Sequence, residues 1–133
     1  MYESKKTVAF FDADPAGIMF FGNLFKYIHS TYEEFLSKVN SKINYFKHDK
    51  VVLPITHTEA DYFAPFYMHE ELKIEVQVSK LKTSSFELNY KIYGSKTKLK
   101  ATAKTVHVCV EKTSMKKTAL PIELEKYLNE NKI

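Results

Sequence analysis

The chain has 133 residues, 44% of them hydrophobic and 27% charged, a composition typical of a packed globular protein and unlike that of a disordered one. No apolar run approaches the roughly 20 residues that cross a bilayer, and the start of the chain lacks the apolar core of a signal peptide. We therefore expect a single domain over residues 1–133, cytoplasmic and without membrane partners. The net charge is +4, but the lysines are spread along the chain and indicate no nucleic-acid partner.

The predicted order of elements is strand, long helix and then a run of strands. A weak strand signal covers residues 7–11. The only long helical pattern follows, and Asn23 is well placed as its N-cap. Its apolar stripe runs at steps of three and four through Leu24, Ile28, Tyr32, Phe35 and Val39.

The second half of the chain predicts mainly strands. A weak signal at residues 51–57 precedes clear alternation of apolar and polar residues at 72–78 and 86–92. In residues 99–110 the apolar positions change from odd to even, which suggests a bulge or a strand covered on both faces. A short amphipathic stretch, Ile122 to Leu128, follows Pro121. We expect an α+β fold, with one long helix on a curved antiparallel sheet of about five strands.

The segment that carries chemistry lies directly before the long helix. Asp14-Pro15-Ala16-Gly17 has the residue order of a type I turn, and Pro15 keeps Asp14 out of the α region. Local pattern alone leaves two interpretations about equally open. Asp14 either accepts hydrogen bonds within its own turn or performs a reaction.

This segment closely resembles the signature of the 4-hydroxybenzoyl-CoA thioesterase family, in which an Asp-x-Asp-x-x-Gly motif precedes the central helix. The matching residues are Phe10, Asp12, Asp14, Pro15, Ala16, Gly17 and Ile18. Residues 61–65 and 84–86 are similar in a looser way, so the resemblance covers most of the chain. It implies a hotdog fold, in which the sheet wraps around the helix, and an enzyme that hydrolyses acyl-CoA thioesters.

The resemblance also implies the roles of individual residues. Asp14 corresponds to the catalytic carboxylate, acting as nucleophile or as general base, and the backbone N–H groups of Phe21 and Gly22 to an oxyanion hole. Asp12, Pro15, Gly17 and Asn23 are expected to support the site. Many members of the family have Tyr at the position of Phe21, which a backbone role tolerates.

Elementary chemistry agrees with this assignment. Free N–H groups and the positive dipole end at a helix start favour a developing oxyanion. A thiol leaves readily as its thiolate, so one carboxylate and one oxyanion hole are sufficient for thioester cleavage. No cofactor is required, because coenzyme A is part of the substrate.

The family's neighbourhood for the coenzyme A phosphates corresponds to Lys80, Lys82 and Ser84, although two solvated edge lysines are an equally good interpretation. We take Lys96, Lys98 and Lys100 as lysines for solubility and edge protection. The histidines show no metal-ligand spacing, so no metal is expected, and Cys109 is interpreted as a small buried hydrophobe.

The resemblance further predicts a homodimer that assembles to a tetramer, because the cleft of one protomer is incomplete until a second sheet edge joins it. The main alternative is an acyl-binding or acyl-carrier-protein-directed hotdog module without CoA hydrolase activity. Nothing here resembles the histidine motif of hotdog dehydratases. The acyl group, aromatic or fatty, stays open.

Overall fold

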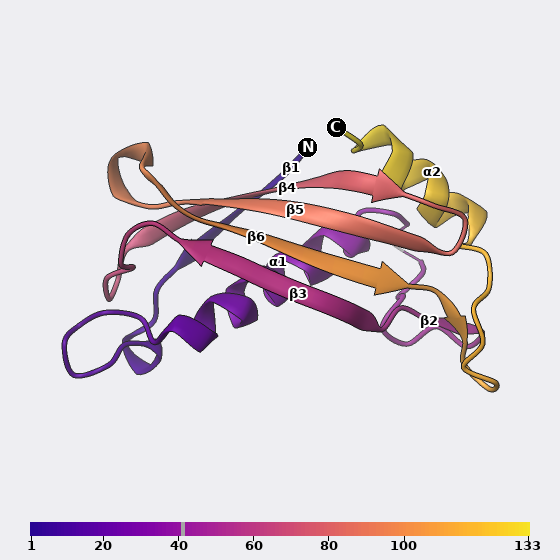
Figure 1. Cartoon of the computed structure of the whole chain (residues 1–133), viewed down its shortest axis with the longest axis horizontal. Helices are drawn as coiled ribbons and strands as arrows, with labels where there is room; N and C mark the ends of the chain where they lie inside the picture. The colour runs from indigo at the N-terminus through magenta and orange to yellow at the C-terminus, as the bar shows by residue number, and fades with distance from the viewer. Residues whose placement is uncertain (41) are drawn as a thin grey trace.

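A five-stranded antiparallel sheet and one long helix make up most of the computed structural model, which describes residues 1–40 and 42–133 (Figure 1). The strands are β1 (Tyr2–Thr7), β2 (Val51–Val52), β3 (Ile55–Tyr62), β4 (Glu71–Leu81), β5 (Ser85–Tyr93), β6 (Leu99–Val108) and β7 (Val110–Glu111). The helices are α1 (Leu24–Ser37) and α2 (Ile122–Glu130), with short 3-10 turns at Phe10–Asp12, Phe21–Asn23 and Ser95–Thr97.

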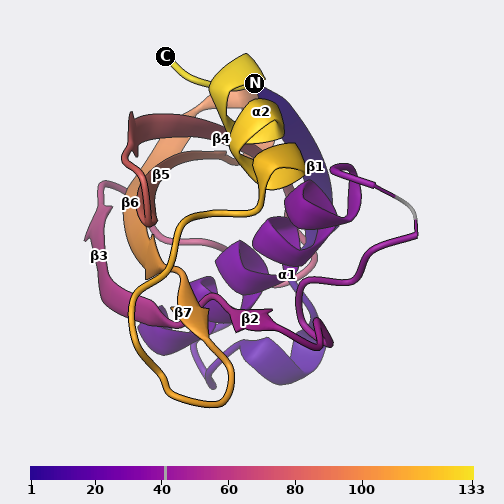
Figure 2. The same ribbon diagram turned by 90° about the vertical axis from the view of Figure 1, so that its right-hand side faces the viewer.

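The main sheet has the order β1-β4-β5-β6-β3, and β2 pairs with β7 in a separate two-stranded sheet. Seen from its end, the main sheet curls around α1 (Figure 2). The alternation predicted for residues 72–78 and 86–92 is confirmed, because the even-numbered residues of both ranges are buried. Leu24, Ile28, Tyr32 and Phe35 of the predicted stripe are also buried, which confirms the amphipathic helix.

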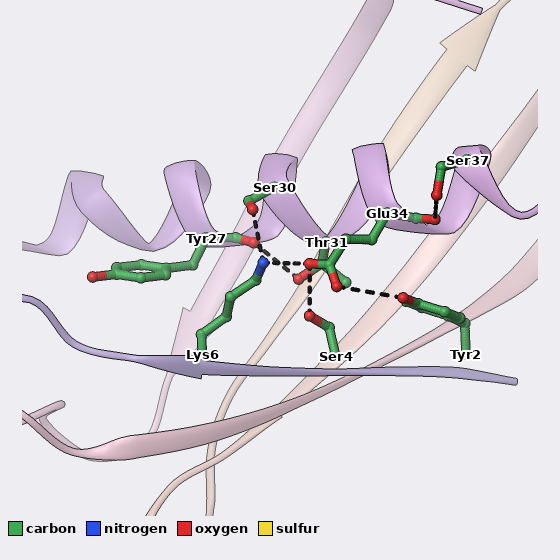
Figure 3. Close-up of polar contacts among 8 residues, drawn as sticks. All are labelled: Tyr2, Ser4, Lys6, Tyr27, Ser30, Thr31, Glu34 and Ser37. Carbon is green, nitrogen blue, oxygen red and sulfur yellow. Dashed lines mark hydrogen bonds and ion pairs between the residues drawn. The ribbon is translucent and has the colours of Figure 1, made fainter. Parts of the chain in front are cut away.

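The first strand was predicted in the wrong place. Residues 10–12 form a 3-10 turn, and the strand is β1, which shares only Thr7 with the predicted range. Hydrophobic alternation missed β1 because its inward residues are polar. Ser4 Oγ donates a hydrogen bond to Glu34 Oε2 at 2.8 Å, and Lys6 Nζ contacts Ser30 Oγ at 2.8 Å and forms an ion pair with Glu34 (Figure 3).

The weak signal at residues 51–57 proves to be two strands, β2 and β3. Residues 53 and 54 separate them, and β3 continues to Tyr62 with exposed side chains along most of its length. An edge strand without a buried face has no alternation to detect. Its length was therefore underestimated.

Strand β6 contains a bulge, one of the two alternatives expected for residues 99–110, because Ile92 pairs with Ala101 and Tyr93 with Leu99, which leaves Lys100 as the extra residue. After this bulge the strand keeps one phase. Its odd-numbered residues 101–107 are all buried. The apolar pattern broke because two of these buried positions carry polar residues, Thr105 and His107. β6 is also a central strand, which was the other alternative, because β5 and β3 flank it.

The closing helix α2 is present and buries Leu124 and Leu128. The chain after it is held to β4, since Val78 N–H donates to Asn131 O at 3.0 Å and Ile133 N–H donates to Val78 O at 2.9 Å. Cys109 is buried, as predicted. No helix within the described residues is long and apolar enough to span a bilayer.

Candidate active site

The loop before α1 folds as a small hairpin around the predicted turn. Asp14 N–H donates to Ile18 O at 2.8 Å, and Gly17 N–H donates to Asp14 O at 2.9 Å, which closes the turn. Gly17 has a φ of 78°, in the left-handed region that favours glycine. The turn residues therefore act as the sequence predicted.

The Asp14 carboxylate is exposed and uses one oxygen to hold this turn. Its Oδ1 accepts hydrogen bonds from Ala16 N–H at 2.8 Å and from Ile18 N–H at 3.3 Å. In the described part of the chain no donor contacts Oδ2. Asp14 therefore has the turn-forming role. This role occupies only one of its two carboxylate oxygens.

Asp12 differs from Asp14 because its carboxylate is buried. Tyr27 OH donates to Asp12 Oδ2 at 2.5 Å, and Lys26 Nζ forms an ion pair with Oδ1. Burial raises the pKa of Asp12, but the hydrogen bonds from Lys26 and Tyr27 outweigh it and hold the pKa below its usual value. Its carbonyl oxygen accepts hydrogen bonds from Phe20 N–H and Asn23 Nδ2, at 3.1 and 3.0 Å.

Asn23 does not act as the N-cap that the sequence predicted. Asn23 immediately precedes α1, but its own backbone is helical and its side chain makes no capping hydrogen bond. A 3-10 turn at Phe21–Asn23 leads into the helix instead. The side-chain amide fastens the helix start to the carbonyl of Asp12, which also fixes the carboxylate loop.

The helix start presents free amide groups. The first N–H groups of a helix have no intrahelical acceptor, and within residues 1–40 and 42–133 neither Phe21 nor Gly22 donates its N–H to another residue. Tyr62 OH donates a hydrogen bond to Phe21 O and so ties the end of β3 to this turn. Burial raises the pKa of Tyr62, which keeps this donor protonated.

A groove of about 380 Å³ lies against the helix start. It is lined by Ile18, Met19, Phe21, Tyr62, Phe63, Ala64, Pro65 and Phe66. The segment after β3 also supports the Asp14 loop, because Met19 N–H donates to Phe66 O at 2.7 Å and Met68 N–H donates to Gly17 O at 3.0 Å. Backbone hydrogen bonds therefore join the Asp14 loop to the segment that lines the groove, and Phe21 of the helix start lines the groove directly.

The model of the thioesterase-like superfamily matches residues 8–128 of this chain. The chain belongs to the thioesterase-like superfamily. Two relatives are named 1,4-dihydroxy-2-naphthoyl-CoA hydrolase. The one from Synechococcus elongatus is 32% identical over 96% of this chain and 94% of its own length. The one from Microcystis aeruginosa is 36% identical over 88% of this chain and 85% of its own length.

A crystal structure of a 1,4-dihydroxy-2-naphthoyl-CoA thioesterase from Synechocystis superposes with a TM-score of 0.88 at 26% identity, covering 97% of this chain and 96% of that one. These similarities confirm the predicted hotdog fold and the predicted class of enzyme, a thioester hydrolase. They also agree with the family resemblance of the segment before α1.

The predicted phosphate contacts lie far from Asp14 in one copy of this thioesterase. Lys80, Lys82 and Ser84 belong to the β4–β5 hairpin, whereas the Asp14 loop lies beside the opposite end of the sheet (Figure 1). Strand β4 has 11 residues, so the two ends are separated by about 33 Å. A single protomer does not bring these residues together.

Lys100 is not the surface lysine that the alternating pattern suggested. Its side chain is 6% exposed and forms an ion pair with Glu70, which is 3% exposed. Only Lys96 and Lys98 of that set are exposed. The sequence offered no sign of the pair, because its partners are separated by 30 residues.

Sequence reasoning also missed the contacts of Lys26 and Tyr27 with Asp12. Both lie in the first turn of α1, 14 and 15 residues after Asp12, so only the folding of the loop against the helix start brings them together. No three His, Cys, Asp or Glu side chains are grouped for metal binding in the part of the chain that the structure describes.

Proposed function

We propose that this thioesterase hydrolyses an acyl-CoA ester and that 1,4-dihydroxy-2-naphthoyl-CoA is the first candidate substrate. The names of its relatives support the substrate class. The observation that supports the chemistry is that an exposed Asp14 carboxylate, with one oxygen free of hydrogen bonds among the described residues, lies in the loop that leads directly to the unpartnered amides of Phe21 and Gly22.

In the proposed reaction the thioester oxygen accepts hydrogen bonds from the Phe21 and Gly22 amides, which stabilise the negative charge that develops on it. Asp14 either attacks the carbonyl carbon or removes a proton from a water molecule that attacks it. The tetrahedral intermediate then expels coenzyme A as its thiolate. By the first route a mixed anhydride on Asp14 forms and is hydrolysed by water, which regenerates the carboxylate.

The two routes differ in whether an acyl group is ever attached to the protein. Rapid quenching during a single turnover, followed by mass spectrometry of the peptide that contains Asp14, distinguishes them. A transient increase by the mass of the acyl group supports the nucleophilic route. An unmodified peptide at every time point supports the general base.

A second copy of the chain completes this site in our proposal. Strand β3 is an edge of the sheet, and its residues are mostly exposed. An edge of eight residues is an open template for pairing. Exposed aromatic side chains, Phe10, Phe11, Phe20, Phe21 and Phe63, surround the loop and the helix start and provide apolar surface for a partner.

Antiparallel pairing of two β3 edges places the Tyr62 end of one sheet beside the Ile55 end of the other. The β4–β5 hairpin lies at the Ile55 end, since Ser85 is opposite Val108 and Ile55 is opposite His107. Lys80, Lys82 and Ser84 of a second copy would thereby approach the end of the sheet that carries Asp14. Sedimentation equilibrium tests the assembly, and a stable monomer at working concentration contradicts it.

The activity is tested with a panel of acyl-CoA esters and detection of the released thiol. Aromatic esters are expected to be hydrolysed fastest, and acetyl-CoA and fatty acyl-CoA are the reference substrates. Turnover of acyl-carrier-protein esters alone, or binding without hydrolysis, would support the alternative of an acyl-carrier-protein-directed or acyl-binding module.

A further inference from the structure

Lys100 is the bulge residue of β6, and its side chain is buried against the rule of that strand. The other even-numbered residues from 102 to 108 are only partly buried, whereas the Lys100 side chain is 6% exposed. Bulges are frequent beside functional sites, where they redirect a side chain. This bulge directs a lysine into the protein at the end of the sheet that lies beside the Asp14 loop (Figure 1).

Lys100 holds the segment after β3 with both its backbone and its side chain. Its carbonyl oxygen accepts hydrogen bonds from Phe63 N–H at 2.8 Å and Ala64 N–H at 3.3 Å. Its ammonium group donates to Pro65 O at 2.8 Å. The centroid of the Tyr67 ring lies 4.9 Å from the same ammonium group, within the range of cation–π attraction. A single residue of β6 therefore contacts almost every residue of this segment.

The segment after β3 belongs to the candidate active site in two ways. Four of its residues line the groove at the helix start. Two backbone hydrogen bonds also join it to the hairpin that presents Asp14, from Met19 N–H to Phe66 O at 2.7 Å and from Met68 N–H to Gly17 O at 3.0 Å. A displacement of the segment would therefore alter the groove and loosen the Asp14 loop together.

A charged side chain is buried here at a cost in desolvation. Glu70 supplies the counter-charge, with Oε1 at 2.7 Å from Lys100 Nζ. Gly94 supplies the space, since a Cβ at this position would overlap the Glu70 carboxylate and lie 2.7 Å from Lys100 Cδ and Cε. Apolar side chains of similar size often stabilise a protein as well as a buried ion pair does. The pair is therefore better explained by the position that it imposes on the segment after β3.

We propose that Lys100 is a positioning residue of this thioesterase, which sets the wall of the groove and the place of the Asp14 loop through Pro65 and its neighbours. It lies beneath the groove wall, so it acts through these residues and not on the substrate. The inference rests on the proposed function for its kinetic test. A second test, by amide exchange, needs no substrate.

Two variants separate position from stability. Glu70→Gln leaves the buried ammonium without a counter-charge, but the Lys100 amine still donates to Pro65 O. Glu70→Gln with Lys100→Met removes the charge and the bond to Pro65 O together. We expect the single variant to unfold at the lower urea concentration. The double variant should nevertheless have the lower kcat/KM, about tenfold below the wild-type protein, while the single variant stays within about threefold of it.

Hydrogen exchange measures the position directly. The Met19 and Met68 amides make the two hydrogen bonds between the segment and the Asp14 loop. Both are expected to exchange about fivefold faster or more in the double variant than in the single variant, by local opening. This order is opposite to that of global stability, so global unfolding does not explain it.

Glu75→Gln with Lys73→Met is the matched control. It makes the same charge change at an ion pair on the outer face of β4, where Lys73 Nζ lies 3.4 Å from Glu75 Oε2 and both side chains are partly exposed. Wild-type kcat/KM and wild-type exchange at Met19 and Met68 are expected.

The proposal is overturned if kcat/KM and exchange follow stability, with Glu70→Gln the most impaired variant, or if the double variant retains both. Should Glu70→Gln not fold, the double variant is compared with the wild-type protein and the control, and unchanged exchange at Met19 and Met68 is the contradicting result. If the wild-type protein hydrolyses no CoA ester, the proposed function fails, and the exchange rates still decide whether Lys100 holds the Asp14 loop.

Discussion

Lys100 Nζ lies 2.6 Å from Glu70 Oε2 in the interior of the protein, where both side chains are almost fully buried. The same carboxylate accepts hydrogen bonds from Tyr67 N–H at 2.9 Å and Ser95 N–H at 2.8 Å, and Lys100 also donates to Pro65 O. The pair thus joins the β5–β6 connection to residues 65–70, which form the backbone that pairs with the Asp14 loop.

Glu70→Gln is expected to destabilise the protein by roughly 3–5 kcal/mol, because it leaves the Lys100 ammonium buried without its counter-charge. Urea unfolding measures the loss. Glu71→Gln is the control, since Glu71 is the exposed neighbour and its substitution should change stability by less than about 0.5 kcal/mol. Equal effects of the two substitutions would show that the ion pair contributes nothing.

The same pair makes stability depend on acid. Burial raises the pKa of Glu70, but hydrogen bonds from Lys100 and from the Ser95 and Tyr67 amides outweigh it and lower the pKa from 4.5 to about 2. Because the folded pKa is the lower one, this stabilisation is complete above the unfolded pKa and is lost as the pH falls from about 5 to 2, about 3 kcal/mol in all. Unfolding free energies measured at several pH values should fall less steeply there for Glu70→Gln.

The two aspartates of the loop are expected to respond in opposite ways. Asp14→Asn should lower kcat on the order of 10³-fold with little change in stability, since the amide oxygen still accepts the turn hydrogen bonds. Asp12→Asn should cost roughly 1–3 kcal/mol of stability, because it removes the charge that Lys26 and Tyr27 surround, and lower kcat less. Stopped-flow kinetics and thermal unfolding of both variants separate the effects. Near-normal turnover by Asp14→Asn would restrict this residue to its turn.

Tyr62→Phe is expected to lower kcat about fivefold and leave KM nearly unchanged, because it frees the Phe21 carbonyl and loosens the turn that presents the oxyanion amides. Steady-state kinetics on one CoA ester provides the measurement. Tyr67→Phe is the control, since the Tyr67 hydroxyl makes no hydrogen bond within the described residues. A change in KM alone would place Tyr62 in substrate binding instead.

Replacing Lys80 and Lys82 together with Ala should raise KM for the CoA ester about 3- to 10-fold, retain kcat and weaken the dependence on salt, if a second copy brings them to the phosphates. A truncated pantetheine thioester, which lacks the nucleotide phosphates, should be indifferent. Should Lys96→Ala with Lys98→Ala produce the effect instead, the phosphates bind at the β5–β6 connection.

Elements with one solvent-exposed face and one buried face could be predicted from the sequence. The α1 stripe and the alternation of β4 and β5 are of this kind, and Pro15 and Gly17 specified the turn that holds Asp14. These features depend on residues that are close together in the sequence, so the sequence pattern was sufficient to predict them.

Features that depend on distant partners could not be predicted. The inward face of β1 reads as polar until Glu34 of α1 satisfies it. Lys100 resembled a surface lysine because Glu70 is remote in sequence, and His107 gave no sign of lining a hollow. In each case a buried polar group is stabilised by a group that only the complete fold supplies.

The strand order has a consequence for how the chain folds. β4, β5 and β6 are consecutive in the chain and adjacent in the sheet. Their contacts join residues that are close in sequence, so we expect them to form early in folding. β1 is different, because Tyr2 pairs with Val76 across most of the domain. The Asp14 loop lies between β1 and α1 and closes only when both are docked. During refolding from urea, the sheet signal should therefore return before turnover does.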